Sequence, residues 1–410
     1  MTYAIIGGGA AGIFSALFIA YADKTSPTIV IYEKNNTLGR KILISGSGRC
    51  NYTNNIPPNE LVKHYNNVPF LKGPLYTLTP QLTMKFFEKL GMASKEENEN
   101  RVFPLSNSSR TVLETLEKEL KKNKVKIIYN SRIVETKKIE NHFCLKDHKD
   151  KTYLADKLII TSGSIAHGGS SDGYTLAKSF GHTITPLKGS LAPVKVVDTK
   201  LSKLSGTSVE SVVLSTNKIK SEGKILITHD GLSGPVVLNH SRHLTTNSLL
   251  TICWVTKNKE SYSKEALYEK LISLIKENKE KSIVSILHLL NLPLKLANHF
   301  VKENVKASTL DKDSLKKLVT NLCEYKVTIR VKEHLAKVTS GGISLKEVDK
   351  NKMESLLVKD LYFAGEVLDI DGPSGGYNLQ AAWSTASFAA ISATGNNPFT
   401  LIPNFITLKE

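Results

Sequence analysis

The sequence has few cysteines and no long hydrophobic run. Its four cysteines, Cys50, Cys144, Cys253 and Cys323, form no C-x-x-C pair and no spacing typical of a metal site. No run of 18 apolar residues is present, which argues against a membrane-spanning helix. The apolar start lacks the charged segment of a secretion signal. We therefore expect free thiols, no metal, no membrane association and a location in a reducing cytoplasm.

The chain is longer than one ordinary domain and strongly basic. At 410 residues, two or three domains are expected, and the formal net charge is +17. Residues 186–335 contain 24 Lys and Arg against 14 Asp and Glu, an excess of 10 positive charges. This excess fits either a solvated lysine-rich surface or a face that binds a polyanion such as RNA.

The first 33 residues carry the clearest motif. An apolar run at residues 3–6 leads into Gly7-Gly8-Gly9-Ala10-Ala11-Gly12, inside which a helical apolar spacing begins. A second apolar run ends at Glu33, 21 residues after Gly12. Strand, G-x-G-x-x-G, helix, strand and acid in this order form the dinucleotide-binding fingerprint.

Each part of this motif has a physical reason. Gly7 permits a tight turn, Gly9 leaves room for a pyrophosphate, and Gly12 allows close packing of helix and strand. The helix N-terminus favours phosphate binding. Glu33 is positioned to accept hydrogen bonds from a ribose without a 2′-phosphate, which favours FAD or NAD over NADP. The motif alone does not separate FAD from NAD.

Small-residue loops recur further along the chain. Residues 45–51, Ser-Gly-Ser-Gly-Arg-Cys-Asn, bring bare backbone N–H groups beside Arg49, which suits an anion or a polar ring edge. A predicted strand at 157–161 ends in Ser162-Gly163-Ser164. Near the C-terminus, a predicted strand at 360–364 ends in Gly365-Glu366, and Gly375-Gly376-Tyr377-Asn378 precedes a helix at 381–393. Glycine runs at both ends of the chain predict a ligand held from two sides.

The remaining patterns predict the domain organisation. Residues 53–80 are expected to form an irregular lid, and helices are expected at 81–90 and 109–122. Residues 189–255 have a β pattern and residues 263–322 a helical one, with residues 325–330 leading back to the first domain. Strands of a β-meander are predicted at 125–129, 132–137, 143–146 and 152–154, and strands of the β region at 192–197, 209–215, 224–228 and 249–254.

These motifs resemble one known family. The stretches at 7–12, 38–41, 45–51, 228–235 and 365–379 are similar to the BaiN/RdsA family of bacterial NAD(P)/FAD-dependent oxidoreductases, also called YhiN-like or aminoacetone-oxidase-like flavoproteins. The resemblance implies an α/β fold: a discontinuous Rossmann-like FAD-binding domain at 1–188 and 336–410. It also implies an inserted β-barrel-like unit at 189–262 and a small helical bundle at 263–335.

The resemblance also implies non-covalent FAD, with NAD(P)H as a transient electron donor because no second fingerprint is visible. We propose Cys50 and Arg49 as candidate catalytic residues, since a thiol can donate the proton that reduction of a C=C bond needs. Motifs and resemblance together give these candidate cofactor-binding residues: Gly7, Gly9, Ala10, Ala11, Gly12, Glu33, Lys34, Arg40, Lys41, Ser45, Gly46, Gly48, Asn51, Val134, Gly163, Gly365, Glu366, Asp369, Gly375, Gly376, Tyr377, Asn378 and Leu379.

Three functions remain open from the sequence. The first is an FAD-dependent reductase of an activated C=C bond, with uridine in ribosomal RNA as the preferred substrate because of the basic insert. The second is a small-molecule oxidoreductase, acting as a steroid-type enone reductase or an amine oxidase. The third is an FAD-binding, RNA-associated protein without turnover.

Overall fold

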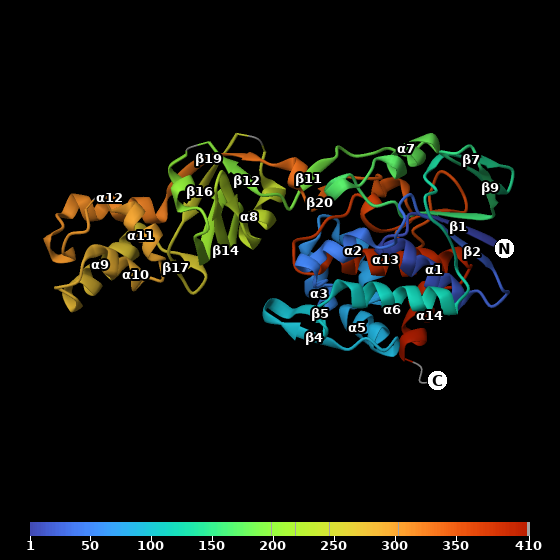
Figure 1. Ribbon diagram of the computed structural model, residues 1–410, viewed down its shortest axis with the longest axis horizontal. Helices are drawn as coiled ribbons and strands as arrows, with labels where there is room; N and C mark the ends of the chain where they lie inside the picture. The colour runs from blue at the N-terminus through green and yellow to red at the C-terminus, as the bar shows by residue number, and fades with distance from the viewer. Residues whose placement is uncertain (198, 218, 246, 302, 408–410) are drawn as a thin grey trace. The chain divides into compact units, whose positions relative to one another are not determined.

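The chain divides into two compact units. Unit 1 comprises residues 1–188 and 338–410, and unit 2 comprises residues 189–337 (Figure 1). The computed structural model describes residues 1–197, 199–217, 219–245, 247–301 and 303–407. The sequence predicts the first boundary at 188/189 and the second at 335/336.

A five-stranded parallel sheet is the centre of unit 1. Its order is β21-β10-β1-β2-β6, with β1 (Thr2–Ile6), β2 (Thr28–Tyr32), β6 (Lys126–Ile128), β10 (Lys157–Ile160) and β21 (Leu361–Phe363). Ala4 and Ile5 are fully buried, as expected for a parallel strand that is covered on both faces. β6 pairs with β2, so its predicted place in the β-meander is wrong: its Ile127 and Ile128 extend the main sheet.

Two long helices pack together beside this sheet. α1 (Ala10–Ala22) contacts α13 (Tyr377–Ala393), with the rings of Phe14 and Trp383 4.3 Å apart between centroids. α6 (Ser109–Lys122) joins α1 through a hydrogen bond from Tyr21 to Glu119. The β-meander contains β7 (Ile133–Ile139), β8 (His142–Asp147) and β9 (Thr152–Ala155).

The irregular lid predicted at residues 53–80 is wrong, and the helix predicted at 81–90 is confirmed, within a folded segment that extends to residue 104. Residues 53–104 form α3 (Pro58–Leu61), α4 (Val68–Thr77), α5 (Pro80–Lys89) and a small sheet of β3 (Thr53–Asn54), β5 (Arg101–Pro104) and β4 (Ser94–Glu97). α4 packs against α13 and buries Phe70, Leu71 and Leu75, so this segment is part of the core. The sequence pattern did not predict α4 because Pro69 and Pro74 disfavour a helix. Tertiary packing stabilises the helix nonetheless.

Unit 2 contains a closed antiparallel barrel. The strand order is β12-β15-β14-β13-β16-β19, with β12 (Val194–Val196), β13 (Ser208–Thr216), β14 (Ile219–Thr228), β15 (Gly231–Ser233), β16 (Ser248–Cys253) and β19 (Tyr325–Val331). β19 pairs with both β16 and β12 and closes the barrel. The sequence assigned residues 325–330 to the return towards unit 1, and this assignment is wrong because Val327 and Ile329 are buried inside the barrel unit.

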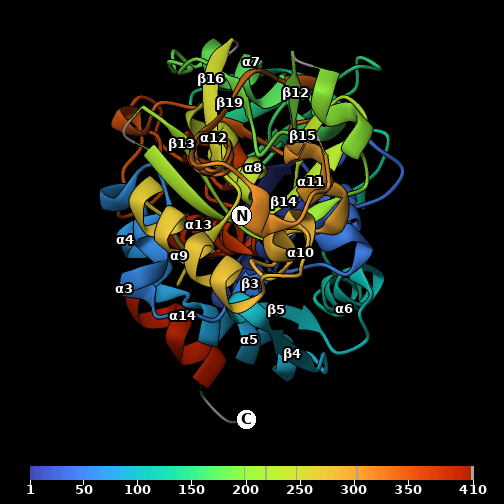
Figure 2. The same cartoon turned by 90° about the vertical axis from the view of Figure 1, so that its left-hand side faces the viewer.

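Four helices gather beside the barrel within unit 2: α9 (Lys264–Glu277), α10 (Ile283–His288), α11 (Leu294–Phe300) and α12 (Lys312–Cys323) (Figures 1 and 2). Barrel and helices share one hydrophobic cluster. The contact between α12 and β16 belongs to it, so no separate helical unit divides off at residue 263. The other helices and strands are α2 (Arg40–Ile44), α7 (Asp172–Ser179), α8 (Pro235–His240), α14 (Pro398–Thr407), β11 (Lys188–Ser190), β17 (Thr256–Lys257), β18 (Glu260–Ser261) and β20 (Val338–Ser340).

Candidate functional site

The carboxyl ends of four parallel strands meet at one edge of the unit 1 sheet. β1 lies between β10 and β2, and β21 lies beyond β10. The residues that follow these strands are 7–12 after β1, Glu33 after β2, 162–164 after β10 and Gly365 after β21. Ligands of open α/β sheets bind in the crevice at this edge, where the direction of strand order changes. The topology therefore brings together four stretches that are far apart in sequence.

The first glycine turn has the geometry that the fingerprint requires. Gly7 has φ +105°, and a Cβ on Gly12 would lie 1.8 Å from the carbonyl oxygen of Gly7. A Cβ on Gly9, in contrast, would meet no atom within 4 Å. Gly9 is the N-cap of α1 and supplies no side-chain cap, so the first-turn N–H groups at Ala10 and Ala11 are available to a ligand.

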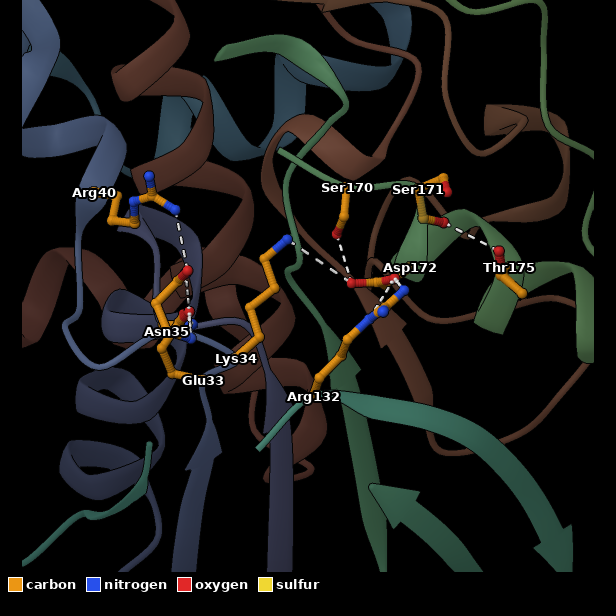
Figure 3. Close-up of polar contacts among 10 residues, drawn as sticks. Glu33, Lys34, Asn35, Arg40, Arg132, Ser170, Ser171, Asp172 and Thr175 are labelled. Carbon is orange, nitrogen blue, oxygen red and sulfur yellow. Dashed lines mark hydrogen bonds and ion pairs between the residues drawn. The ribbon is translucent and has the colours of Figure 1, made fainter. Parts of the chain in front are cut away.

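Glu33 lies at the end of β2 with its side chain in this turn. Its Oε2 accepts a hydrogen bond from the Gly8 N–H at 2.7 Å, and its Oε1 accepts one from the Asn35 N–H at 2.8 Å. Arg40 Nη1 donates to Asn35 Oδ1 at 3.0 Å, which ties the start of α2 to the same loop (Figure 3). Asn35 Nδ2 donates to Oε1 as well. A carboxylate offers about four acceptor positions, so Glu33 retains capacity for a hydroxyl donor.

Lys34 takes part in a charged cluster with the first turn of α7. Its Nζ lies 3.9 Å from Asp172 Oδ2, and Arg132 Nη2 donates to Asp172 Oδ1 at 2.6 Å (Figure 3). Burial alone would raise the pKa of Asp172, but the hydrogen bonds from Arg132 and Ser170 hold it below its usual range. The cluster fixes the beginning of β7, where half-exposed Val134 lies, close to the end of β2. Motif reasoning missed Arg132 and Asp172 because they belong to no glycine run.

Lys41 connects three distant segments. Its Nζ donates to Glu366 Oε2 at 2.6 Å and to Ser164 Oγ at 3.0 Å. Glu366 Oε1 also accepts a hydrogen bond from the Thr339 N–H at 3.1 Å. Lys41, Glu366 and the loop containing Gly163, whose φ is +72°, therefore lie together at the sheet edge. Thr339 was not predicted as a site residue, because its hydrogen-bond partners Glu366 and Ala166 are 27 or more residues away in sequence.

The loop of residues 45–51 presents a tight turn with one unpaired acceptor. Gly46 has φ +54°, and a Cβ there would lie 2.7 Å from the Asn51 nitrogen, while a Cβ on Gly48 would meet open space. Ser45 Oγ donates to the Ile42 carbonyl at 2.7 Å. Asn51 is 8% exposed, and its Oδ1 has no hydrogen-bond partner within the described parts of the chain. A buried carbonyl oxygen of this kind fits a ligand that donates a hydrogen bond.

Arg49 and Cys50 have different surroundings from those expected of a proton-donating pair. Arg49 binds Glu97 and Asn107, and its guanidinium lies 4.1 Å from the centroid of the Phe103 ring. Cys50 is fully buried, and burial raises the pKa of its thiol to about 12. The catalytic role of both residues stays a prediction, and their contacts favour a role in holding this loop.

The C-terminal glycine run begins the longest helix of unit 1. Gly375 and Gly376 have φ values of +117° and +96°, and a Cβ on Gly376 would lie 2.3 Å from the Thr53 carbonyl oxygen. Gly376 is the N-cap of α13 and provides no side-chain cap. Asn378 donates to the carbonyls of Gly372 and Pro373, so it holds the preceding loop.

The other C-terminal candidates surround this N-terminus. Tyr377 accepts a hydrogen bond from Tyr65 at its carbonyl, and the carbonyl of Asp369 accepts one from Asn67. Leu379 packs partly buried against the hydrophobic core.

In the chain's described portion, no three His, Cys, Asp or Glu side chains form a group that could hold a metal ion. No helix among the described residues is long and apolar enough to cross a membrane.

Three named proteins are similar to this chain over nearly its whole length. A 3-dehydro-bile acid delta(4,6)-reductase from Clostridium scindens is 30% identical over 404 residues, covering 95% of this chain and 98% of the relative. Ribosomal RNA dihydrouridine synthases from Haemophilus influenzae and Escherichia coli are each 29% identical; they cover 95% and 93% of this chain and 97% and 95% of their own lengths.

A solved structure shares the fold. The 3-ketosteroid delta1-dehydrogenase from Sterolibacterium denitrificans matches 96% of this chain and 99% of its own, with a TM-score of 0.51 and 11% identity. The HI0933-like protein Rossmann domain matches residues 1–392. The resemblance given by the sequence motifs is thereby confirmed. The chain belongs to the family of HI0933-like proteins with a Rossmann domain.

Proposed function

We propose that this protein is an FAD-dependent oxidoreductase that uses NAD(P)H to reduce an activated C=C bond, with uridine in ribosomal RNA as its preferred substrate. The observation that carries this proposal is the pair of activities named among relatives that match nearly the whole chain. Dihydrouridine is uridine with two hydrogens added across one C=C bond, and the bile acid enzyme is named as a reductase. Both names therefore fit addition of hydride and proton to a conjugated double bond.

The residues at the sheet edge fit FAD. Open space beside Gly9 and the uncapped N-terminus of α1 suit a pyrophosphate, which needs close backbone approach and N–H donors. Unpaired Asn51 Oδ1 suits a ring N–H. The uncapped N-terminus of α13, behind Gly376, suits a polar ring edge that gains negative charge. These are three independent features of the described structure, on segments from both ends of the chain.

The chain's own residues have defined tasks in this proposal. Glu33 accepts hydrogen bonds from ribose hydroxyls, and α1 holds the phosphates. Lys41 and Glu366 fix the two loops that flank the ligand, because their ion pair joins segments 325 residues apart. FAD, when bound, supplies the hydride chemistry, and the protein supplies position and electrostatics.

The choice of ribosomal RNA over a small molecule depends on charge. Residues 186–335 carry an excess of 10 positive charges, and exposed Lys312, Lys316 and Lys317 lie on α12. Phosphate contacts dominate the affinity of proteins for nucleic acids. The relative from Clostridium scindens favours the alternative, a small-molecule reductase of a steroid-type enone. NAD(P)H binds transiently in either case, since the sequence contains no second G-x-G-x-x-G fingerprint.

The test begins with the purified full-length protein under anaerobic conditions. We expect a yellow protein whose FAD is released by acid, bleaches on addition of NADPH or NADH, and regains its colour when an rRNA transcript is added. Nucleoside mass spectrometry of that transcript should show dihydrouridine. The competing substrates are a steroid enone, added to the bleached protein as an alternative electron acceptor, and an amine, added to the oxidised protein as an alternative electron donor. Recovery of colour with the enone but not with RNA overturns the substrate, and a protein that cannot be loaded with flavin overturns the whole proposal.

A further inference from the structure

Two of the four cysteines meet in unit 2. Cys253 is the last residue of β16, and Cys323 is the last residue of α12, 70 positions later. The Trp254 N–H donates to the Leu322 carbonyl at 2.8 Å, which fixes the two segments side by side. The two side chains lie near enough to affect each other's pKa, and Cys253 Sγ donates a hydrogen bond to the Val255 carbonyl at 3.1 Å. Because each cysteine ends its element, its side chain can shift without breaking a ladder or a helical turn.

Both thiols line one cavity. Its volume is about 580 Å³, and the cationic side chains of Lys220, Lys264 and Lys326 line it as well. Cys253 is 4% exposed and Cys323 is 7% exposed, so the thiols are protected from bulk solvent but reachable by a small molecule that enters the cavity. Glu265 and Glu324 line it too, and Lys264 is paired with Glu324 at 3.0 Å, so Lys220 is the nearby cation that favours a thiolate at Cys253.

The pair divides into a nucleophile and a proton holder. The nearby Cys323 side chain, together with Lys220, lowers the pKa of the Cys253 thiol. The nearby Cys253 side chain, together with burial and the charge of Glu324, raises the pKa of the Cys323 thiol. Cys253 therefore loses its proton more readily than Cys323, and the thiolate is the form that reacts with oxidants.

A metal does not account for the pair. A zinc site needs three or four protein ligands, and among the residues that the structure describes no third His, Cys, Asp or Glu completes one. Cys50 and Cys144 belong to unit 1 and are free thiols. Of the four cysteines, only Cys253 and Cys323 belong to unit 2, so neither Cys50 nor Cys144 is part of this pair.

We propose that Cys253 and Cys323 form a peroxide-sensitive dithiol that closes reversibly to an intramolecular disulfide. The Cys253 thiolate attacks one oxygen of hydrogen peroxide; the O–O bond breaks, the leaving hydroxide takes one proton from solvent, and a sulfenic acid and water result. The Cys323 sulfur then attacks the Cys253 sulfur, its proton leaves with the hydroxyl as a second water, and the S–S bond forms. Two thiols are oxidised, one peroxide is reduced to two waters, and an external thiol reverses the step.

The test uses the full-length protein as purified, treated with a small excess of hydrogen peroxide. After iodoacetamide blocking and digestion without reductant, mass spectrometry should find a peptide pair linked through Cys253 and Cys323, and dithiothreitol should remove it. In Cys253→Ser, which cannot form this pair, Cys323 should be recovered as an alkylated thiol after the same peroxide treatment. Cys144→Ser, the matched control on β8, should leave the yield of the linked pair unchanged.

Two outcomes overturn the proposal. One is recovery of both cysteines as alkylated thiols under conditions that oxidise small dithiols. The other is progression of either cysteine to sulfinic or sulfonic acid without any linked peptide, which would show that the second sulfur does not reach the first. Both are decided on the wild-type protein, so neither depends on whether a variant folds.

Discussion

The candidate site of unit 1 is built largely from backbone, whereas the reactive and charged groups of unit 2 are side chains. In unit 1, glycines with positive φ and the uncapped starts of α1 and α13 define the site. In unit 2, the notable groups are the lysines of α12, the thiol pair and one buried histidine. Ligand affinity at a site made of backbone is lost when a single Cβ fills the ligand's space. Affinity at a surface made of side chains decreases gradually as individual side chains are replaced. The units should therefore respond differently to substitution.

Gly9→Val should produce the largest effect. A Cβ at this position would meet no atom within 4 Å, so we expect the fold to be retained, but the side chain fills the space proposed for the pyrophosphate. We expect flavin affinity to fall on the order of 100-fold, equivalent to about 2.7 kcal/mol, as measured by flavin fluorescence titration. Gly12→Val is the contrasting variant: its Cβ would lie 1.8 Å from a carbonyl oxygen, and it should fail to fold. A folded Gly9→Val that keeps its flavin would refute the assigned phosphate position.

The second prediction uses pH to destabilise unit 2. His240 is fully buried, with Ser221 at Nδ1 and Thr216 at Nε2, and burial lowers its pKa to about 4. The unfolded chain takes up this proton at a pH near 6.5. Stability is therefore complete above about pH 6.5 and falls towards pH 4, by about 3 kcal/mol in total.

Tryptophan fluorescence can assign this loss, since each unit has one buried tryptophan: Trp383 in unit 1 and Trp254 in unit 2. Urea unfolding of a Trp383→Phe protein at several pH values reports on unit 2. His240→Gln should flatten the pH dependence between pH 6.5 and 4, whereas His229→Gln, on an 85% exposed side chain, should not. Equal slopes for wild type and His240→Gln would exclude His240 as the cause.

The third prediction concerns the lysines of α12. Reversing Lys312, Lys316 and Lys317 to Glu should weaken binding to a single-stranded rRNA fragment by about tenfold and lower the salt slope by up to about 2, at about 0.7 per phosphate. FAD content should not change. The matched control is reversal of exposed Lys118, Lys121 and Lys122 on α6, which changes the net charge equally. Equal losses in both triple variants would mean that net charge alone, and no face of unit 2, governs binding.

The smallest effect is expected at Cys50. Because the thiol is fully buried and its pKa is raised to about 12, we expect Cys50→Ala to change flavin reduction and substrate reduction each by less than about twofold. Stopped-flow measurement of the two half-reactions separates them. A tenfold loss restricted to substrate reduction would establish Cys50 as the proton donor after all.

The sequence predicted unit 1 well where a local rule applies. β1, the glycine turn and α1 follow from apolar runs and G-x-G-x-x-G, and Glu33 follows from spacing. α4 was missed because its two prolines disfavour a helix that burial of Phe70 and Leu71 nonetheless stabilises. The ion pair of Lys41 with Glu366 spans 325 residues, and no local pattern contains such a contact.

Unit 2 was harder to predict for a different reason. β15 has three residues, which is too short for a periodic pattern. β19 does alternate buried and exposed residues, but its place between β16 and β12 depends on barrel closure, which is a property of the whole unit. The thiol contact between Cys253 and Cys323 likewise arises from packing of α12 against the end of β16.

The most direct test of the proposed function is nucleoside mass spectrometry of ribosomal RNA from a strain that lacks this protein. The strain is complemented with the wild-type protein or with Gly9→Val at equal protein levels. We expect dihydrouridine to disappear from the rRNA of the deletion strain, to return with the wild-type protein and to remain absent with Gly9→Val. Dihydrouridine at the wild-type level in the deletion strain would contradict the assignment of rRNA uridine as the substrate.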